Sequence, residues 1–316
     1  THPRIGKMLI IGCLLGCPHE TLSISSFLAA RGPLVSGADV RSSEWAAARG
    51  ELVGTVGFIS DHLLWALLLN DWEQHNVGQK RQMVLKYGLV FERMNEAVRE
   101  KQLMAISLVE LGLLPRDFER EKTDVRTNAK WPLVVAAIVG GMYPNIVYAE
   151  HVGQHKSKGD VMERSHNLRY QVLRRHHSQQ EAMSYPMPIH VHPVSVGFGA
   201  DHFHCPYMTF FTSQQTSRLY CYDATEVTPW SVLVMSGDDP VFEETGSTSH
   251  VKVGRWAKFE CQSPSIMQVI AAVRGAWNRT FERKLRDPKW DHSKSHELLV
   301  IRRLLLDQGL GFELTR

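Results

Sequence analysis

The chain lacks the motifs that hold nucleotides and nucleophiles in the common enzyme classes. Its 316 residues contain no G-x-x-x-x-G-K-[ST] phosphate loop, no G-x-G-x-x-G, no H-E-x-x-H and no G-x-S-x-G. The partial match Gly197-Phe198-Gly199 has neither the third glycine nor a helix pattern after it. These absences exclude the standard nucleotide, zinc-protease and esterase sites, so we predict no catalytic residue, metal or cofactor within this chain.

Cysteines and long apolar runs are also scarce. The five cysteines are an odd number spread over a long chain, which indicates free thiols in a reducing, intracellular compartment and leaves nucleus, cytoplasm and mitochondrion open. The longest nearly uncharged apolar stretches, residues 8–17 and 133–143, are shorter than the roughly 18 to 20 residues of a membrane span. We expect a soluble protein without a membrane partner. Because Thr1 opens the chain without a secretory leader, we also expect a piece of a longer protein.

The hydrophobic periodicity changes near the middle of the chain. Apolar residues recur at helical spacing up to residue 142, and short β-branched and aromatic runs follow from 145 to 261. The sequence therefore predicts an α+β fold with three parts: a helical bundle over 1–144, a small closed β-barrel over 145–262 and a C-terminal helical extension over 263–316.

Capping and turn residues predict the individual elements. Ser60 is the expected N-cap of a helix over 61–75, and Pro264 is the expected first residue of a helix that reaches about residue 285. The remaining predicted helices span 82–111, 131–142 and 295–310, with a surface connection over 116–130. The predicted strands span 146–151, 168–173, 189–192, 207–212, 219–222, 232–235 and 256–260.

Four histidines in the β half could form a metal site. His190 and His192 share one face of a predicted strand, and His202 and His204 follow with Cys205. His-x-His is a weak pattern and no acidic partner is evident, so histidines on a basic surface are the default interpretation. A metal-dependent barrel enzyme remains the alternative.

A basic run over 155–177 is the second candidate site. It contains Lys156, Lys158, Arg164, Arg169, Arg174 and Arg175 against only two acids. On the face of a barrel such a run would follow a phosphate backbone, and Tyr170 would stack on bases. A merely solvated loop is the competing interpretation.

Several segments, in order, resemble the C-terminal region of DEAH/RHA-type ATP-dependent RNA helicases. The segment 2–33 resembles the entry into their helicase-associated ratchet bundle, and Ser60-Asp61-His62-Leu63 resembles a helix start within it. The Gly-Met-Tyr-Pro-Asn ending at Asn145 is similar to the junction with their oligonucleotide-binding (OB) barrel. The later segments 191–196, 216–220, 223–227 and 256–259 are similar to strands of that barrel.

The resemblance implies a role in holding single-stranded RNA beside an ATPase core. In such enzymes two RecA-like domains bind ATP and Mg²⁺, and here they would lie upstream of Thr1; RNP or protein cofactors are further possible partners. Carried over by position, the hydrogen-bonding contacts to RNA would come from His192, Ser195, Thr216 and Ser217, although strand-end capping explains Ser195 and Thr216 equally well. The positive charge would come from Arg218, Arg174, Arg175, Lys156 and Lys158.

A different class of function is also open. The helicase-associated bundle and the OB barrel could be degenerate and serve as a protein-docking scaffold without RNA binding. If the histidines of the second half lie on the RNA path, RNA affinity should rise as the pH falls from about 7.5 to 6, because imidazoles with a pKa near 6.5 gain charge.

Overall fold

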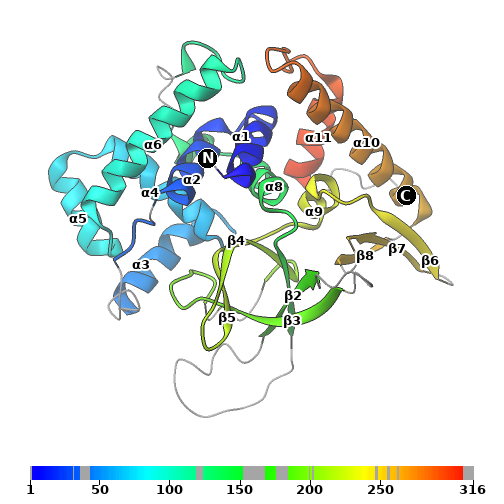
Figure 1. Ribbon diagram of the computed structural model, residues 1–316, viewed down its shortest axis with the longest axis horizontal. Coiled ribbons are helices and arrows are strands. Elements are labelled where there is room, and N and C mark those ends of the chain that lie inside the picture. Colours follow the sequence, from blue (N-terminus) through cyan, green and yellow to red (C-terminus); the bar gives the residue numbers. More distant parts are fainter. Residues whose placement is uncertain are drawn as a thin grey trace.

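The computed structural model shows a helical bundle above a small barrel, with a second sheet and two helices beside them (Figure 1). It describes residues 2–30, 32–35, 43–118, 124–151, 168–175, 184–198, 200, 203–245, 248–254, 257–261 and 263–308. The α+β architecture of bundle, barrel and C-terminal helices predicted from the sequence is confirmed.

The bundle packs around α4 and α8, two helices that are buried along most of their length. Every residue of α8 from Leu133 to Met142 is buried, and α8 lies against α1 at close range, where a Cβ added to Gly141 would stand 2.5 Å from the Cβ of Met8. Ser60 caps α4 as predicted, since its Oγ accepts a bond from the Leu63 N–H at 3.0 Å. The bundle helices are α1 Pro3–Leu15, α2 Pro18–Ala29, α3 Ser43–Gly54, α4 Asp61–Gln74, α5 Val77–Tyr87, α6 Phe91–Glu110, α7 Val125–Asn128 and α8 Trp131–Met142.

Two helical predictions need correction. The helix expected over 82–111 is two helices, because α5 ends at Gly88, whose φ of 66° is left-handed, and α6 starts anew at Phe91. The stretch 116–130 is more than a surface connection, since it contains α7 and the buried side chains of Phe118 and Val125.

The barrel closes from five strands in the order β1-β2-β3-β5-β4, with β1 paired to β4. All pairs are antiparallel except β3 with β5, which run parallel. The strands are β1 Ile146–His151, β2 Leu168–Arg175, β3 Ser184–Val191, β4 Tyr207–Gln215 and β5 Leu219–Glu226. Its own apolar core includes Val147, Val172, Ile189, Val191, Met208, Phe210, Leu219, Cys221 and Ala224.

The segment after the barrel differs from the prediction. Residues 232–235, expected as a strand, belong to the helix α9 Pro229–Met235, because Thr228 and Ser231 form a capping box that starts it. The strand expected near 256–260 does form, as β8 Ala257–Cys261, but it pairs with β6 Val241–Thr245 and β7 Thr248–Val253 in a separate sheet and not in the barrel. The barrel strands thus end at Glu226 within the region predicted as 145–262, and Trp256 lies outside the described residues.

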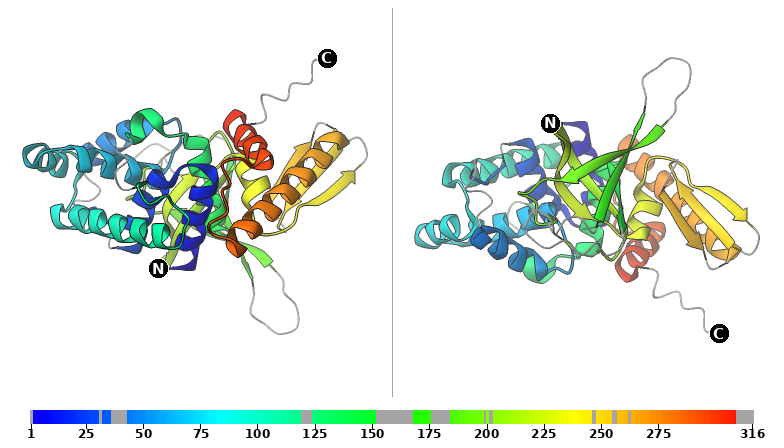
Figure 2. Two further views of the ribbon diagram at one scale, coloured as in Figure 1. Left: turned by 90° about the horizontal axis from the view of Figure 1, so that it is seen from above. Right: turned by 90° about the horizontal axis from the view of Figure 1, so that it is seen from below.

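Two C-terminal helices complete the fold. The helix α10 Pro264–Arg286 lies along the three-stranded sheet, and α11 His296–Asp307 returns toward α1 and α8 (Figure 2). Both match their predicted positions. In the part of the chain that the structure describes, no helix has the length and apolar character needed to cross a membrane.

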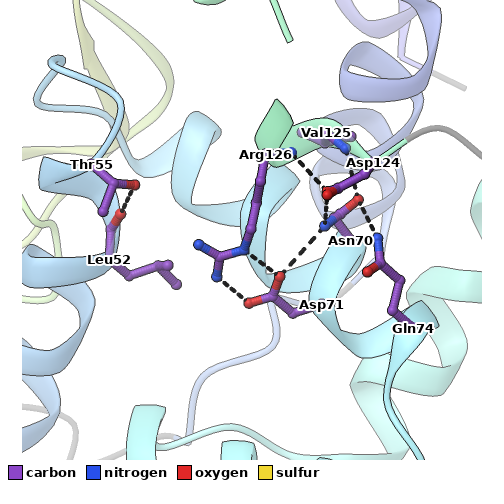
Figure 3. Close-up of polar contacts among 8 residues, drawn as sticks. All are labelled: Leu52, Thr55, Asn70, Asp71, Gln74, Asp124, Val125 and Arg126. Atoms are coloured by element: carbon purple, nitrogen blue, oxygen red, sulfur yellow. Dashed lines mark hydrogen bonds and ion pairs between the residues drawn. The ribbon is translucent and has the colours of Figure 1, made fainter. Parts of the chain in front are cut away.

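The C-terminal half of α4 is held to α7 by a polar network (Figure 3). The Asn70 side-chain oxygen Oδ1 accepts the Val125 N–H at 2.9 Å, and the side-chain nitrogen Nδ2 donates to Asp124 at 3.2 Å. The Arg126 guanidinium donates to both carboxylate oxygens of Asp71. This network fixes the short connection before α8 against the side of the bundle.

Candidate nucleic-acid interface

Four rings lie in a row on the outside of the barrel, on the parallel pair β3 and β5 and on the residue that follows β3. Val191 and Cys221 pair in register and point into the barrel core, so their neighbours in the chain point outward. We call the resulting row of half-exposed His190, Tyr220, His192 and Tyr222 the ring ladder. Its successive ring centroids are 5.8, 5.7 and 4.3 Å apart, and the last pair, His192 with Tyr222, is stacked at 28°.

The turn between β4 and β5 borders one end of the ring ladder. Thr216, Ser217 and Arg218 are exposed there, and the Thr216 N–H donates to the Arg218 carbonyl at 2.9 Å. Burial and then the nearby positive charge of Arg218 lower the pKa of His190. The turn therefore exposes a cation and two hydroxyl-bearing residues just before Tyr220, and their predicted contact with RNA stays a prediction.

The edge of β4 extends this surface to the other end of the ladder. Exposed Gln214 pairs with Tyr220, and exposed Thr212 pairs with Tyr222. Thr212 also lines a hollow of about 470 Å³ with His2 and Arg4 at the start of α1. A continuous strip of polar groups and rings thus runs from the β4–β5 turn to the base of the bundle.

The imidazole of His192 is held in place on its polar side as well. Its Nδ1 accepts the Val194 N–H at 3.2 Å, which requires that nitrogen to be unprotonated. With one face on Tyr222 and Nδ1 engaged, the ring is fixed in orientation.

Other predicted site residues lie elsewhere. Ser195 is only 6% exposed, and its Oγ accepts the Gly197 N–H at 3.1 Å, so the structure places it inside the molecule and off the accessible surface. Tyr170 points into the barrel core against Phe203 and does not offer its ring to a base, because its position in β2 faces inward.

The basic run is described only in part. Arg174 and Arg175 lie in β2, in register with Tyr185 and Ser184, but their side chains are outside the described part of the structure. Lys156 and Lys158 lie outside the described residues altogether. Their predicted role stays a prediction.

The histidines considered as an alternative metal site do not form one where they are described. His204 donates its backbone N–H to Glu226 and lies 3.1 Å from the same carboxylate through Nδ1, while His202 is outside the described residues. Within the described ranges, no group of three or more His, Cys, Asp or Glu side chains could hold a metal ion.

Sequence reasoning missed the dense polar contact between the start of α4 and β5, which we call the junction. The Asp61 carboxylate accepts the N–H groups of Val196 and Ala224 at 2.8 and 2.9 Å. Thr225 Oγ1 lies 2.7 Å from both Ser60 Oγ and His62 Nδ1. The signal was present in the helix start Ser60-Asp61-His62, but its partners on β5 are more than 160 residues away.

Burial shifts the pKa values of the junction in different directions. It lowers the pKa of His62 to about 3, which keeps the imidazole neutral. Burial and then the neighbouring charge of Asp61 raise the pKa of Asp223 to about 7, although a bond from Trp65 opposes the shift. The pKa of Asp61 is also raised by burial. These groups connect the bundle helix α4 to the barrel strand β5.

Comparison with known families matches the three parts of the chain. The ratchet-like helicase associated domain (HA2) matches residues 2–65, the oligonucleotide/oligosaccharide-binding (OB)-fold residues 134–238, and the C-terminal domain in RNA helicases residues 249–307. The order is the one that the resemblance predicts.

Curated relatives carry the same region. The ATP-dependent DNA/RNA helicase DHX36 of Mus musculus is 24% identical over 96% of this chain and 28% of its own length. The DExH-box ATP-dependent RNA helicase DExH1 of Arabidopsis thaliana is 25% identical over 92% of this chain and 26% of its own length. The chain thus spans less than a third of these relatives. Over nearly its whole length the chain is therefore similar to the C-terminal region of the DExH-box RNA helicases, with the HA2, OB-fold and helicase C-terminal domains in that order.

Proposed function

We propose that this chain binds single-stranded RNA along the ring ladder and the β4–β5 turn, as the accessory part of an ATP-dependent RNA helicase. The observation that carries the proposal is the ladder itself, four half-exposed rings in sequence on a barrel of OB type. Aromatic faces stack on unpaired bases with little regard to sequence, and a nearby arginine binds phosphate.

In the parent protein, RecA-like domains preceding this chain would bind ATP and Mg²⁺ and hydrolyse the nucleotide. The ring ladder would hold the single strand while those domains step along it. The hollow beside Arg4 and Thr212 supports a path that continues from the Tyr222 end of the ladder toward the bundle. Since the contacts are stacking and charge, we expect slight sequence preference.

A fluorescence-anisotropy titration with a labelled 12-nucleotide oligouridylate tests the proposal. We expect affinity to fall as salt rises, and to fall at least fivefold in Tyr222→Ala and threefold in Arg218→Ala. Arg286→Ala is the matched control, since that arginine is 82% exposed on α10, away from the ladder, and its removal should leave affinity within twofold.

The same titration separates RNA binding from a protein-docking scaffold. A scaffold predicts weak, salt-independent binding that none of these variants changes. The reversal of Arg174 and Arg175 to Glu adds a test of β2: weaker binding by several-fold supports a track of positive charge there, and unchanged binding restricts the interface to β3, β5 and the turn.

A further inference from the structure

The strand β5 changes the side on which its residues face the barrel core, and this change occurs at Asp223. Leu219 and Cys221 point into the core, two residues apart as in any strand. The next core residue is Ala224, three positions further on. With regular alternation Ala224 would share a face with Tyr222 and Tyr220, so the rings would point inward with it.

The backbone of Asp223 explains the change. Its φ is 53°, in the left-handed region that non-glycine residues enter rarely and that Asp and Asn tolerate best. The pairing with β4 continues on both sides of Asp223, and β4 changes its facing at the same place, since Phe210 lies in the core and Thr212, the partner of Tyr222, is exposed. The left-handed Asp223 thus marks the point on β5 beyond which Tyr220 and Tyr222 face outward.

The helix α4 holds this residue from the bundle side. Trp65 Nε1 donates to the Asp223 carboxylate at 3.2 Å, and Asp61 accepts the N–H of the next residue, Ala224. Thr225 is bonded to Ser60 and His62. Three consecutive residues of β5 are thus tied to the first two turns of one bundle helix.

From this geometry we propose that Trp65 is a positioning residue, which acts through Asp223 to keep the ring ladder turned outward for stacking on RNA. The inference rests on the proposed function for its RNA consequence, but the ring orientation is a property of the free protein. A helix of the ratchet bundle then determines the shape of the RNA-binding face of the barrel without touching RNA.

The first test uses the free chain. Stacking on Tyr222 shifts the ring protons of His192, so their NMR chemical shifts report the ladder directly. We expect Trp65→Phe, which keeps a ring and removes the N–H, to move these signals toward random-coil values. Trp72→Phe is the matched control on the same helix, because its Nε1 donates to Asn95 at 3.1 Å, away from the barrel. Unchanged His192 signals in Trp65→Phe would overturn the proposal.

Substitutions at Asp223 separate backbone from side chain. Asp223→Asn keeps both the tolerated φ and an oxygen for Trp65, so it should retain the His192 signals. Asp223→Gly keeps the φ without strain but loses the acceptor, and should shift them without unfolding the chain. Asp223→Ala loses both and should shift them most. Wild-type signals in Asp223→Gly and Asp223→Ala would contradict the role of this residue even if Trp65→Phe fails to fold.

RNA binding provides the second test. Trp65→Phe should weaken oligouridylate binding at least fivefold, and Trp72→Phe less than twofold. The double variant Trp65→Phe/Tyr222→Ala should bind no worse than Tyr222→Ala alone, because both changes remove the same contact. Full additivity would indicate a general structural effect and contradict the positioning role. If Tyr222→Ala binds like the wild type, the proposed function fails, while the NMR result still decides the orientation.

Discussion

Both ends of α4 bind segments that are distant in the sequence, but they do so through different interactions. At its start, Asp61 is 3% exposed and accepts the backbone N–H of Ala224 within β5 and that of Val196 in the segment after β3. Near its end, Asp71 pairs with Arg126, whose side chain is 39% exposed. A buried carboxylate that satisfies backbone donors is costly to remove, whereas a pair open to water is screened. The bonds of Asp61 should therefore contribute more to the stability of the fold than the bonds between Asp71 and Arg126.

The comparison is tested most strongly at Asp61. Asp61→Ala leaves the buried N–H of Ala224 and the part-buried N–H of Val196 without an acceptor, and we expect it to lower the free energy of unfolding by about 3–5 kcal/mol. Asp61→Asn, which can still accept one of the two bonds, should lose less. Urea denaturation followed by circular dichroism measures both. A loss below about 1 kcal/mol for Asp61→Ala would show that the junction does not depend on this carboxylate.

The other end of α4 should respond less. Arg126→Met keeps much of the side-chain length but removes both bonds to Asp71, and we expect a loss of about 1–2 kcal/mol. Added salt should shrink the difference from the wild type, because the pair is partly open to solvent. A loss as large as that of Asp61→Ala in the same urea titrations would remove the contrast between the two ends.

A third prediction concerns pH at the junction. The pKa of Asp223 is raised to about 7 in the folded protein, above the value near 3.9 of an unperturbed aspartate. The folded state then binds a proton that the unfolded state does not. The stability from this group is fully present below about pH 4 and is lost as the pH rises through about 7.

Between pH 6.5 and 8 the wild type should therefore lose roughly 1 kcal/mol of stability relative to Asp223→Asn. The buried His62 acts in the opposite direction around pH 6.5, because its pKa of about 3 keeps it neutral while the unfolded chain gains a proton, but it does so in both proteins and cancels in the difference. Urea midpoints at pH 6.5, 7, 7.5 and 8 check the prediction. An Asn variant with the same pH slope as the wild type would contradict it.

The smallest expected effect is the pH dependence of RNA binding. The pKa of His190 is below its usual range, and Nδ1 of His192 accepts a bond that protonation would break. We therefore expect affinity to rise less than about threefold from pH 7.5 to 6, and the rise to continue below pH 6. Anisotropy titrations at constant ionic strength measure it, with His190→Gln as the variant that should flatten the profile. A tenfold rise by pH 6 would show that protonated histidines dominate the interface.

Local sequence signals were sufficient to predict an element where its formation depends only on residues close to it in the sequence. Ser60, Pro264 and the apolar run of α8 predicted helices that the structure confirms, because capping, the fixed φ of proline and helical periodicity operate within a few residues. The prediction of a strand over 232–235 was wrong. Four β-branched or apolar residues fit a strand and a buried helix equally well, and here the capping box of Thr228 starts a helix.

The candidate site was predictable in part for the same reason. Thr216, Ser217 and Arg218 lie in a turn, where exposure follows from local structure. Tyr170 and Ser195 were placed by residue type and by resemblance, but whether they face the core or the surface depends on register and on the bundle behind the barrel. The ring ladder joins two strands that are about 30 residues apart, and no local pattern pairs them.

By itself, then, the sequence determined the order of bundle, barrel and C-terminal helices, the absence of the common nucleotide-binding motifs, and the helices that begin at strong caps. Only the tertiary structure decided which faces of β3 and β5 meet solvent. The reason is that alternation along β5 is broken at one aspartate, in a backbone conformation whose partners come from a helix more than 150 residues earlier in the chain.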